Sequence, residues 1–418
     1  MSDQKIPLRN DLPAMTALNG LRVLDLSRIL AGPWSSQILA DLGAEVIKVE
    51  RPRQGDDSRR WEPSVPLGEN GVAASAYFCA ANRGKQSITV NLASAEGADI
   101  IRRLAEVSDV LIENYKADDL ARYGLGYEDL SKINPRLVYC SITGFGQTGP
   151  YRARAGYDTI IQAMGGLMSI TGERDDRPGG GAQRSGMPVI DLMTGIYAAV
   201  AILAALRHRD ASGVGQHLDL SLLDVQVSSL AYFGLNYLAT GRIQSRMGNT
   251  NPVTHPSGVY SCADRQIVIL VGNDDQFARF CVILGLPELA RDERFASSGL
   301  RVQHSAALDC QIIPVLQSAT ASVWINKLEQ VGVPCGPIND MAAVFSDPHI
   351  QARGAATSVS HPELGEIPIL ASPIRMSVTP VQYCLAPPLL GEHTRDVLSR
   401  LLGFGGKDFD ELCSKGIV

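Results

Sequence analysis

The stretch LRVLDLSRILAGPWSSQILADLGAEVIKVE (21–50) contains a complete strand–helix–strand unit. Its opening run, LRVLDL (21–26), is short and apolar, which is typical of a buried strand. Pro33 favours the first turn of a helix that continues to Leu42. EVIKVE (45–50) predicts a second strand. Because a helix-length crossover joins two strands of the same direction, this unit indicates a parallel sheet.

The same alternation continues toward residue 145. Three more strands are predicted at QSITVNL (86–92), DVLIE (109–113) and RLVYCSI (136–142), with helices at 95–106 and 127–133. Strands that alternate with helices predict a Rossmann-like α/β domain, in which helices cover both faces of the sheet.

The rest of the chain indicates a large domain that is split in sequence by a smaller one. Residues 143–190 are rich in Gly and Pro, as expected for a ligand-binding loop at the carboxyl side of a parallel sheet. Helical patterns follow, and QIVILV (266–271) predicts a strand of a smaller α/β domain. The expected division is the first part of a large Rossmann-like domain over 1–210, linker helices over 211–244, the small domain over 245–335, and a return linker with the last part of the large domain over 336–418.

Composition excludes several classes of protein. The 418 residues are 45% apolar and 20% charged, with a formal charge of −6, whereas nucleic-acid binders need a basic surface. Eight scattered cysteines form no C-x-x-C pair, which indicates reduced, mostly buried thiols and a cytoplasmic location. The longest strongly apolar stretch, 196–206, is too short to span a bilayer and predicts a buried core helix.

Familiar cofactor motifs are weak or missing. GFGQTG (144–149) matches G-x-G-x-x-G, but Pro150 and the broken sequence after it do not begin the helix that a dinucleotide needs. No Walker A motif, no G-x-S-x-G elbow and no H-E-x-x-H spacing occurs in the sequence. We therefore expect no metal and no serine-hydrolase chemistry.

Aspartates are the stronger candidates for chemistry. Asp191, in GMPVIDLMTGIYAAVA, lies where a Gly/Pro-rich loop meets an apolar helix, and Asp158, in RAGYDTIIQ, has a similar position. Either could simply cap its helix, because Asp accepts N–H bonds at helix starts. An Asp at such a junction can also face a ligand. Asp25, inside a strand, favours a buried structural bond.

Basic residues of the first domain fall at strand ends and in loops. Each alone favours a solvated surface charge, and as a set they could hold phosphates. They are Arg28, Arg51, Arg83, Lys85 and Arg122.

Taken together, the motifs resemble the class III CoA-transferases, the family of formyl-CoA and carnitine CoA-transferases. The resemblance covers nearly the entire chain. Its motifs, in order, are VLDLSRILAGP (23–33), GAEVIKVERP (43–52), NRGKQSITVNL (82–92), DVLIENY (109–115), GFGQTGPY (144–151), AGYD (155–158), IDLMTGIYA (190–198), GVPCGPIND (332–340) and PPLLGEHT (387–394).

This resemblance implies that the large domain binds CoA and that the subunit is ring-shaped, in an interlocked homodimer. It implies acyl-CoA and a free carboxylic acid as substrates, with no permanently bound cofactor. It implies that Asp191 is the nucleophile and that Asp158 is an accessory catalytic group. The implied CoA contacts are Arg28, Ile29, Arg51, Val90, Asn114, Tyr115, Arg122 and Tyr123.

Within the family the chain resembles the succinyl-CoA:glutarate CoA-transferases most. The resemblance implies dicarboxylates such as succinate, glutarate or itaconate, with succinyl-CoA as donor and an aspartyl anhydride and an aspartyl-CoA thioester as intermediates. Arg28 and Leu30 replace other side chains of the formyl-CoA enzyme, so the likeness to that enzyme does not extend to the geometry around the thioester. MGNTNPVTHP (247–256) stands where that enzyme has a glycine-rich loop, which argues against formate and oxalate.

Two alternatives stay open. The α-methylacyl-CoA racemases resemble this chain too, but their resemblance implies a His–Asp pair. Here Tyr157 stands at the histidine position, where a pKa near 10 makes a poor base. A non-catalytic CoA-binding protein, with Asp191 only a cap, is the second.

Overall fold

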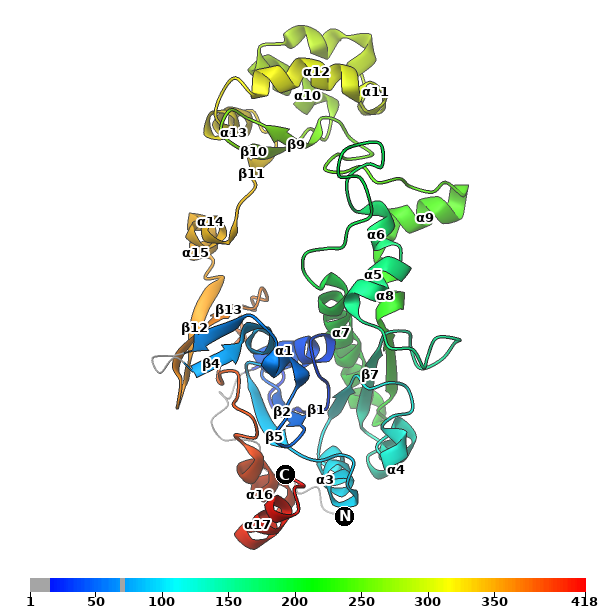
Figure 1. Cartoon of the computed structure of the whole chain (residues 1–418), viewed down its shortest axis with the longest axis vertical. Helices are drawn as coiled ribbons and strands as arrows, with labels where there is room; N and C mark the ends of the chain where they lie inside the picture. The colour runs from blue at the N-terminus through cyan, green and yellow to red at the C-terminus, as the bar shows by residue number, and fades with distance from the viewer. Residues whose placement is uncertain (1–15, 68–71) are drawn as a thin grey trace. The chain divides into compact units, whose positions relative to one another are not determined.

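The computed structural model describes residues 16–67 and 72–418 (Figure 1). The chain divides into two compact units. The first consists of Met1–Gly166, Gly186–Leu235 and Ala352–Val418, and the second of Leu167–Ser185 and Asn236–Gln351. The small domain expected over 245–335 lies within the second unit.

A six-stranded sheet is the centre of the first unit. Its strands are β1 (Arg22–Asp25), β2 (Glu45–Glu50), β5 (Lys85–Thr89), β6 (Val110–Glu113), β7 (Val138–Thr143) and β8 (His217–Ser221). Their order is β5-β2-β1-β6-β7-β8, and every neighbouring pair is parallel. The predicted α/β fold with a parallel sheet is therefore confirmed.

The strand order reverses beside β1. From β1 the chain first builds outward to β2 and β5, then returns to place β6 on the other side of β1. The loops that leave the carboxyl ends of β1 and β6 consequently diverge, and the crevice between them is where doubly wound sheets bind ligands.

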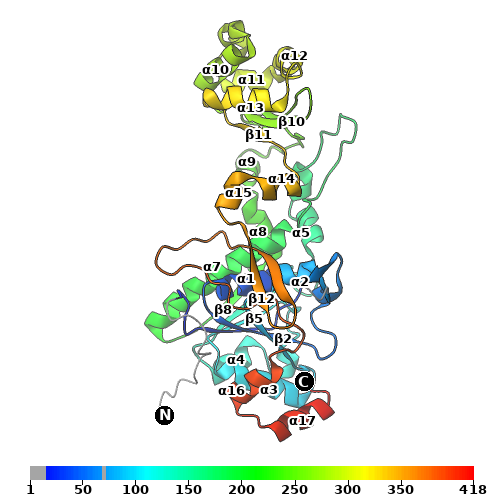
Figure 2. The same cartoon turned by 90° about the vertical axis from the view of Figure 1, so that its left-hand side faces the viewer.

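Helices cover both faces of this sheet (Figures 1 and 2). On one face α1 (Ala31–Asp41) packs against α7 (Val189–Ser212). On the other lie α3 (Ala95–Glu106), α4 (Tyr127–Ile133) and α16 (Thr394–Leu402). The sequence of α3 explains its packing on the sheet. Its apolar residues Ile100, Ile101 and Leu104 recur at helical spacing and are buried in the same core as β1 and β2.

Helix α7 is by length and composition the one described helix that could cross a membrane, with a mean hydropathy of 2.1 over its apolar window. Of that window, 44% is buried inside the unit. The helix packs against α1, β7 and β8. The prediction is therefore only partly met: the helix packs in the core, but less than half of its apolar window is buried, and that window is longer than the stretch expected from the sequence.

Shorter elements complete the first unit. They are the hairpins β3 (Ser64–Leu67) with β4 (Val72–Ser75) and β12 (Ala356–His361) with β13 (Gly365–Leu370), and the helices α2 (Ala76–Ala80), α5 (Asp158–Met164), α8 (Leu222–Ser229) and α17 (Gly406–Ser414).

The second unit has its own core. Its antiparallel sheet consists of β9 (Ser257–Ser261), β10 (Gln266–Leu270) and β11 (Cys335–Pro337), and the helices packed in its core include α10 (Asp274–Leu284), α12 (Ser305–Leu316) and α13 (Ala321–Gln330). Its other helices are α6 (Leu167–Ile170), α11 (Ser298–Gln303) and α14 (Met341–Ser346), while α9 (Ala231–Thr240) and α15 (Pro348–Ala352) lie at its junctions with the first unit.

Two expectations need correction. Strand β8 was not predicted, because its sequence HLDLS alternates polar and apolar residues and forms a half-exposed edge strand. The cysteines are all free, but only three of the eight are buried and three are exposed, so their burial is not general.

Candidate active site

The loop after β1, Ser27–Leu30, forms one wall of the crevice. Asn114, which follows β6, binds this loop across the point where the strand order reverses. The Arg28 amide donates to Asn114 Oδ1 at 2.8 Å, and Asn114 Nδ2 donates to the Arg28 carbonyl at 2.7 Å. The two ligand loops of the sheet are thus fixed to each other.

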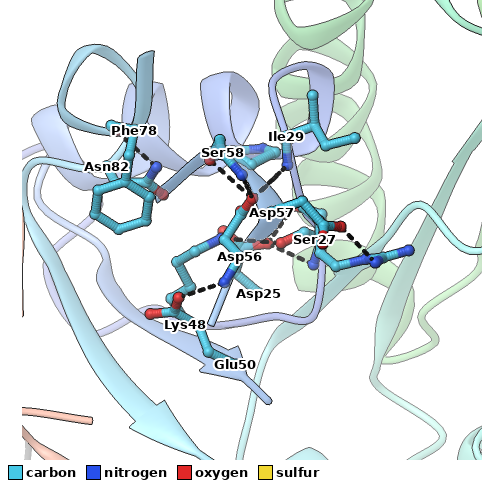
Figure 3. A network of polar contacts seen from close by, with 12 residues as sticks. Asp25, Ser27, Ile29, Lys48, Glu50, Asp56, Asp57, Ser58, Phe78 and Asn82 are labelled. Atoms are coloured by element: carbon cyan, nitrogen blue, oxygen red, sulfur yellow. Dashed lines mark hydrogen bonds and ion pairs between the residues drawn. The ribbon is translucent and has the colours of Figure 1, made fainter. Parts of the chain in front are cut away.

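A buried ion-pair network lies beneath the same loop (Figure 3). Lys48 of β2 donates to the Ser27 carbonyl at 3.0 Å and to Asp56 Oδ2 at 2.9 Å. Asp56 in turn accepts the Ile29 amide on both carboxylate oxygens, at 3.1 and 3.2 Å. Burial opposes ionisation of Asp56, but Lys48 and the bonds from Ser58 outweigh it and hold its pKa well below the usual range.

Two residues expected on the surface form buried ion pairs instead. Lys85 is fully buried and contacts Asp25 at 3.2 Å, and burial lowers its pKa to about 7. Arg83 is buried and forms a two-bond ion pair with Asp41. The prediction that both are solvated charges is wrong, because each cation is matched to a carboxylate. The expected structural role of Asp25 is confirmed.

Asp191 lies in the first turn of α7 and does not cap it. The N-cap is Pro188, and the carboxylate that serves the amides of this turn comes from Asp158. Asp158 Oδ1 accepts the amides of Ile190 at 2.8 Å and Asp191 at 3.2 Å, while Gln162 donates to its Oδ2 at 2.5 Å. The capping role expected of Asp191 is therefore filled by the other aspartate, which leaves the Asp191 carboxylate available.

Asp191 has an unusual electrostatic environment for an aspartate. Burial and then the nearby Asp158 raise its pKa to about 7. No Lys or Arg of residues 16–67 or 72–418 forms an ion pair with it. A carboxylate of this basicity is a better nucleophile than an ordinary one and is still partly ionised at neutral pH.

A cavity of about 220 Å³ joins Asp191 to the β1 loop, and we call it the Asp191 cavity. Its lining residues are Arg28, Ile29, Leu30, Ala31, Asn114, Tyr115, Lys116, Asp119, Ile142, Thr143, Gly144, Arg152, Arg154, Ala155, Gly156, Tyr157, Asp191 and Leu222. Four of the expected CoA contacts, Arg28, Ile29, Asn114 and Tyr115, are among them.

The other expected CoA contacts lie elsewhere. Arg51 and Val90 line a small neighbouring pocket that shares Arg28 and Tyr115 with the Asp191 cavity. Arg122 is exposed and paired with Asp119, and Tyr123 packs against the core of the unit. Neither lines the Asp191 cavity or its small neighbour.

Sequence reasoning missed much of the opposite wall. Gly144 and Gly156 bring two segments of the 144–157 loop together, and a Cβ on Gly144 would lie 2.5 Å from the Gly156 Cα. This contact places Arg154 and Tyr157 at the cavity. The glycines were visible in the sequence, but their mutual approach was not.

The loop and the cavity can also be compared with what dinucleotide, histidine and metal chemistry would need. After GFGQTG no helix begins until α5 at Asp158, so the loop has no helix N-terminus for a pyrophosphate. No histidine lines the Asp191 cavity. Within the described ranges, no group of three or more His, Cys, Asp or Glu side chains is arranged to hold a metal ion.

The chain is similar to known proteins over nearly its whole length. The sequence profile of CoA-transferase family III matches residues 18–394. The succinate–glutarate CoA-transferase of Agrobacterium fabrum is 47% identical over 390 residues, covering 92% of this chain and 95% of that one. The human succinyl-CoA:glutarate CoA-transferase is 40% identical over 410 residues, covering 98% and 92%.

A solved structure shares the fold over nearly the same length. The crystal structure of a CAIB/BAIF family protein from Brucella suis superimposes with a TM-score of 0.82 at 44% identity, covering 93% of this chain and all of that one. By profile, sequence and fold, the chain belongs to CoA-transferase family III.

Proposed function

We propose that this enzyme transfers CoA from an acyl-CoA to a free dicarboxylic acid, with Asp191 as the covalent relay. The proposal depends on the environment of the Asp191 carboxyl group. It has no cation partner in the described chain, its pKa is raised to about 7, and it shares a cavity with the β1 loop. A carboxylate with such a raised pKa and no counter-charge destabilises the fold when ionised, and groups of this kind concentrate at functional sites.

The chemistry needs no metal, because each leaving group is good. Asp191 attacks the thioester carbonyl, the C–S bond breaks, and CoA departs as the thiolate. The donor acyl group is then joined to Asp191 as a mixed anhydride. The thiolate then attacks the aspartyl carbonyl and releases the donor acid, so that CoA is bound to Asp191 as a thioester. The acceptor carboxylate repeats both steps in reverse and restores the Asp191 carboxylate.

Asp158 would act as the accessory group. Its carboxylate accepts the amides of Ile190 and Asp191, so it fixes the first turn of α7 and thereby the nucleophile. Its negative charge contributes to the raised pKa of Asp191. It thus positions the nucleophile and increases its basicity.

Two observations support a dicarboxylate substrate: the cations that line the Asp191 cavity, and the succinate and glutarate in the names of the two relatives. Arg28 is paired with Asp57, and Arg152 with Asp118. The Arg154 guanidinium lies over the ring of Tyr151, 3.9 Å from its centroid, and no ion pair joins it or Lys116 to a carboxylate of the described ranges. Because Lys116 directly follows Tyr115 on the side expected to bind CoA, Arg154 is the better candidate for the distal carboxylate of the acid.

We extend the proposal to a homodimer in the cytoplasm. Helix α7 carries exposed apolar side chains at Ile196, Tyr197 and Val200, which a second subunit would cover. The interlocked arrangement rests on the family resemblance, and the compartment on the free cysteines.

Mass spectrometry after mixing the enzyme with succinyl-CoA tests the mechanism. We expect a covalent adduct on the peptide that contains Asp191, and hydroxylamine should convert it to a hydroxamate. Asp191→Asn should form no adduct and should lose transfer by at least about 10³-fold while still binding CoA. Oxygen from labelled water entering the product acid during turnover would indicate a thioesterase and contradict the proposal.

Steady-state transfer rates with different acceptor acids test the substrate class. Arg154→Gln should raise the KM of a dicarboxylate acceptor about tenfold, since a charge-assisted hydrogen bond is lost. It should leave a monocarboxylate acceptor of similar length unaffected. The matched control is Arg291→Gln, an exposed cation outside the Asp191 cavity and outside the 143–190 loop.

A further inference from the structure

The backbone of Ile29 is strained. Its φ is +71°, in the left-handed region, and among the described non-glycine residues with positive φ it is the one with a β-branched side chain. For such residues this conformation is a genuine outlier, because the Cβ crowds the following carbonyl. Strain of this kind persists only where the surroundings over-determine it, and it concentrates at functional sites.

The surroundings of Ile29 supply that constraint through buried charge. Asp56, 1% exposed, accepts the Ile29 amide on both oxygens (Figure 3). Lys48, fully buried, neutralises Asp56 and also holds the Ser27 carbonyl. Ser58 donates its amide and its hydroxyl to Asp56 Oδ1, at 2.9 and 2.8 Å, which fixes the carboxylate itself.

The neighbouring residues are held in the same way from other directions. The Ser27 amide donates to Asp25 at 2.9 Å, and both backbone groups of Arg28 are bound by Asn114. Ile29 is therefore the last of three consecutive residues, Ser27 to Ile29, whose backbone is anchored by side chains. Because this segment lines the Asp191 cavity, the anchors determine the shape of the wall there.

We infer that Asp56 is a positioning residue for acyl-CoA: it holds Ile29 in the left-handed conformation, so that the CoA-binding wall of the Asp191 cavity is formed before the ligand arrives. This inference rests on the proposed function, because it assumes that CoA binds along the β1 loop. It assigns Asp56 no contact with the reacting atoms. Its effect should therefore appear in binding more than in the chemical step.

The test compares two variants that damage the fold alike. Asp56→Ala leaves buried Lys48 without its carboxylate, and Asp41→Ala does the same to buried Arg83 at the far end of α1. We expect both to lower the melting temperature. Only Asp56→Ala should raise the dissociation constant of CoA, measured by calorimetry, and the KM of succinyl-CoA, by about tenfold, with kcat changed far less.

Relief of the strain provides the decisive control. Glycine takes a φ near +70° without penalty, so Ile29→Gly should make the β1 loop less dependent on Asp56. When Asp56→Ala is combined with Ile29→Gly, loss of the carboxylate should weaken CoA binding only about twofold, against about tenfold when Ile29 is retained. Asp56→Asn, which keeps one acceptor oxygen, gives the same comparison if the alanine variant does not fold.

The outcomes separate the inference from the proposed function. If Asp56→Ala binds CoA as tightly as the wild type, or no more weakly than Asp41→Ala, the positioning role is wrong while CoA transfer stands. The same holds if the penalty of Asp56→Ala is equal with and without Ile29→Gly. If the wild-type enzyme binds CoA but shows no transfer, the proposed function fails and the positioning role survives. If the wild type does not bind CoA, both are overturned.

Discussion

Two groups of carboxylates in the first unit have opposite electrostatic environments, one fully buried and the other built around the half-buried Asp191. Beneath the β1 loop, Asp25 and Asp56 are fully matched by Lys85 and Lys48, and their pKa values are lowered. At the start of α7, Asp191 forms no ion pair with a Lys or Arg of the described residues, and burial and the nearby Asp158 raise its pKa to about 7. We infer that the first arrangement holds the β1 loop rigid, and we propose that the second makes Asp191 reactive. The difference shows that low exposure alone does not decide the state of a carboxylate; its neighbours do.

Removing one cation from the β1-loop network should have the largest effect on stability. Lys48→Met leaves Asp56 buried without its counter-charge, and breaking such a pair from one side costs about 3–5 kcal/mol in free energy of unfolding. Urea denaturation measures the loss. Lys132→Met, at an exposed position of α4, is the control and should change stability by less than about 0.5 kcal/mol. If Lys48→Met lost as little stability as the control, the Lys48–Asp56 pair would not stabilise the β1 loop as described.

Removing the charge at Asp191 should raise the free energy of unfolding, whereas Lys48→Met lowers it. An unfolded Asp loses its proton near pH 4, whereas folded Asp191 keeps it to about pH 7. Between these values the folded state binds more protons, so wild-type stability falls as pH rises through this window. Asp191→Asn does not titrate, and its advantage in free energy of unfolding should grow from pH 4 to pH 7, reaching roughly 2–4 kcal/mol.

Urea unfolding at several pH values between 4 and 8 tests this gain. The control is Glu106→Gln at an exposed position, whose difference from the wild type should stay flat across the range. A variant whose advantage shrinks as pH rises would show that Asp191 is stabilised in its charged form. The two regions would then not differ as described.

Local sequence predicted the scaffold well and the site only in part. The bounds expected for β2, α3 and α4 match the structure, because each has a clear period and clear ends. Strand β8 was missed because edge strands lack a continuous apolar run. The burial of Lys85 could not be predicted, since its partner Asp25 lies 60 residues earlier in sequence and meets it only through the sheet.

The pairing of the two site aspartates illustrates the same limit. Asp158 and Asp191 were each recognised as junction residues, and a capping role was considered for each separately. In the structure Asp158 caps the helix that carries Asp191, across a separation of 33 residues. Spacing along the chain shows which residues begin helices, but not which helix a side chain reaches.

Asp158→Asn should have the smallest effect and tests the like-charge part of the comparison. The amide oxygen of Asn can still accept the two α7 amides, so the position of Asp191 should be kept while the neighbouring charge is removed. The pKa of Asp191 should fall, but burial, the larger cause of its elevation, remains. The acidic limb of kcat/KM reports the ionisation of free Asp191 and should therefore move to lower pH by about one unit or less. Steady-state rates between pH 5 and 9 measure the shift, with Glu106→Gln as the control. An acidic limb that moves to higher pH would show that Asp158 lowers the pKa of its neighbour, as a hydrogen-bond partner would, instead of raising it as a second negative charge.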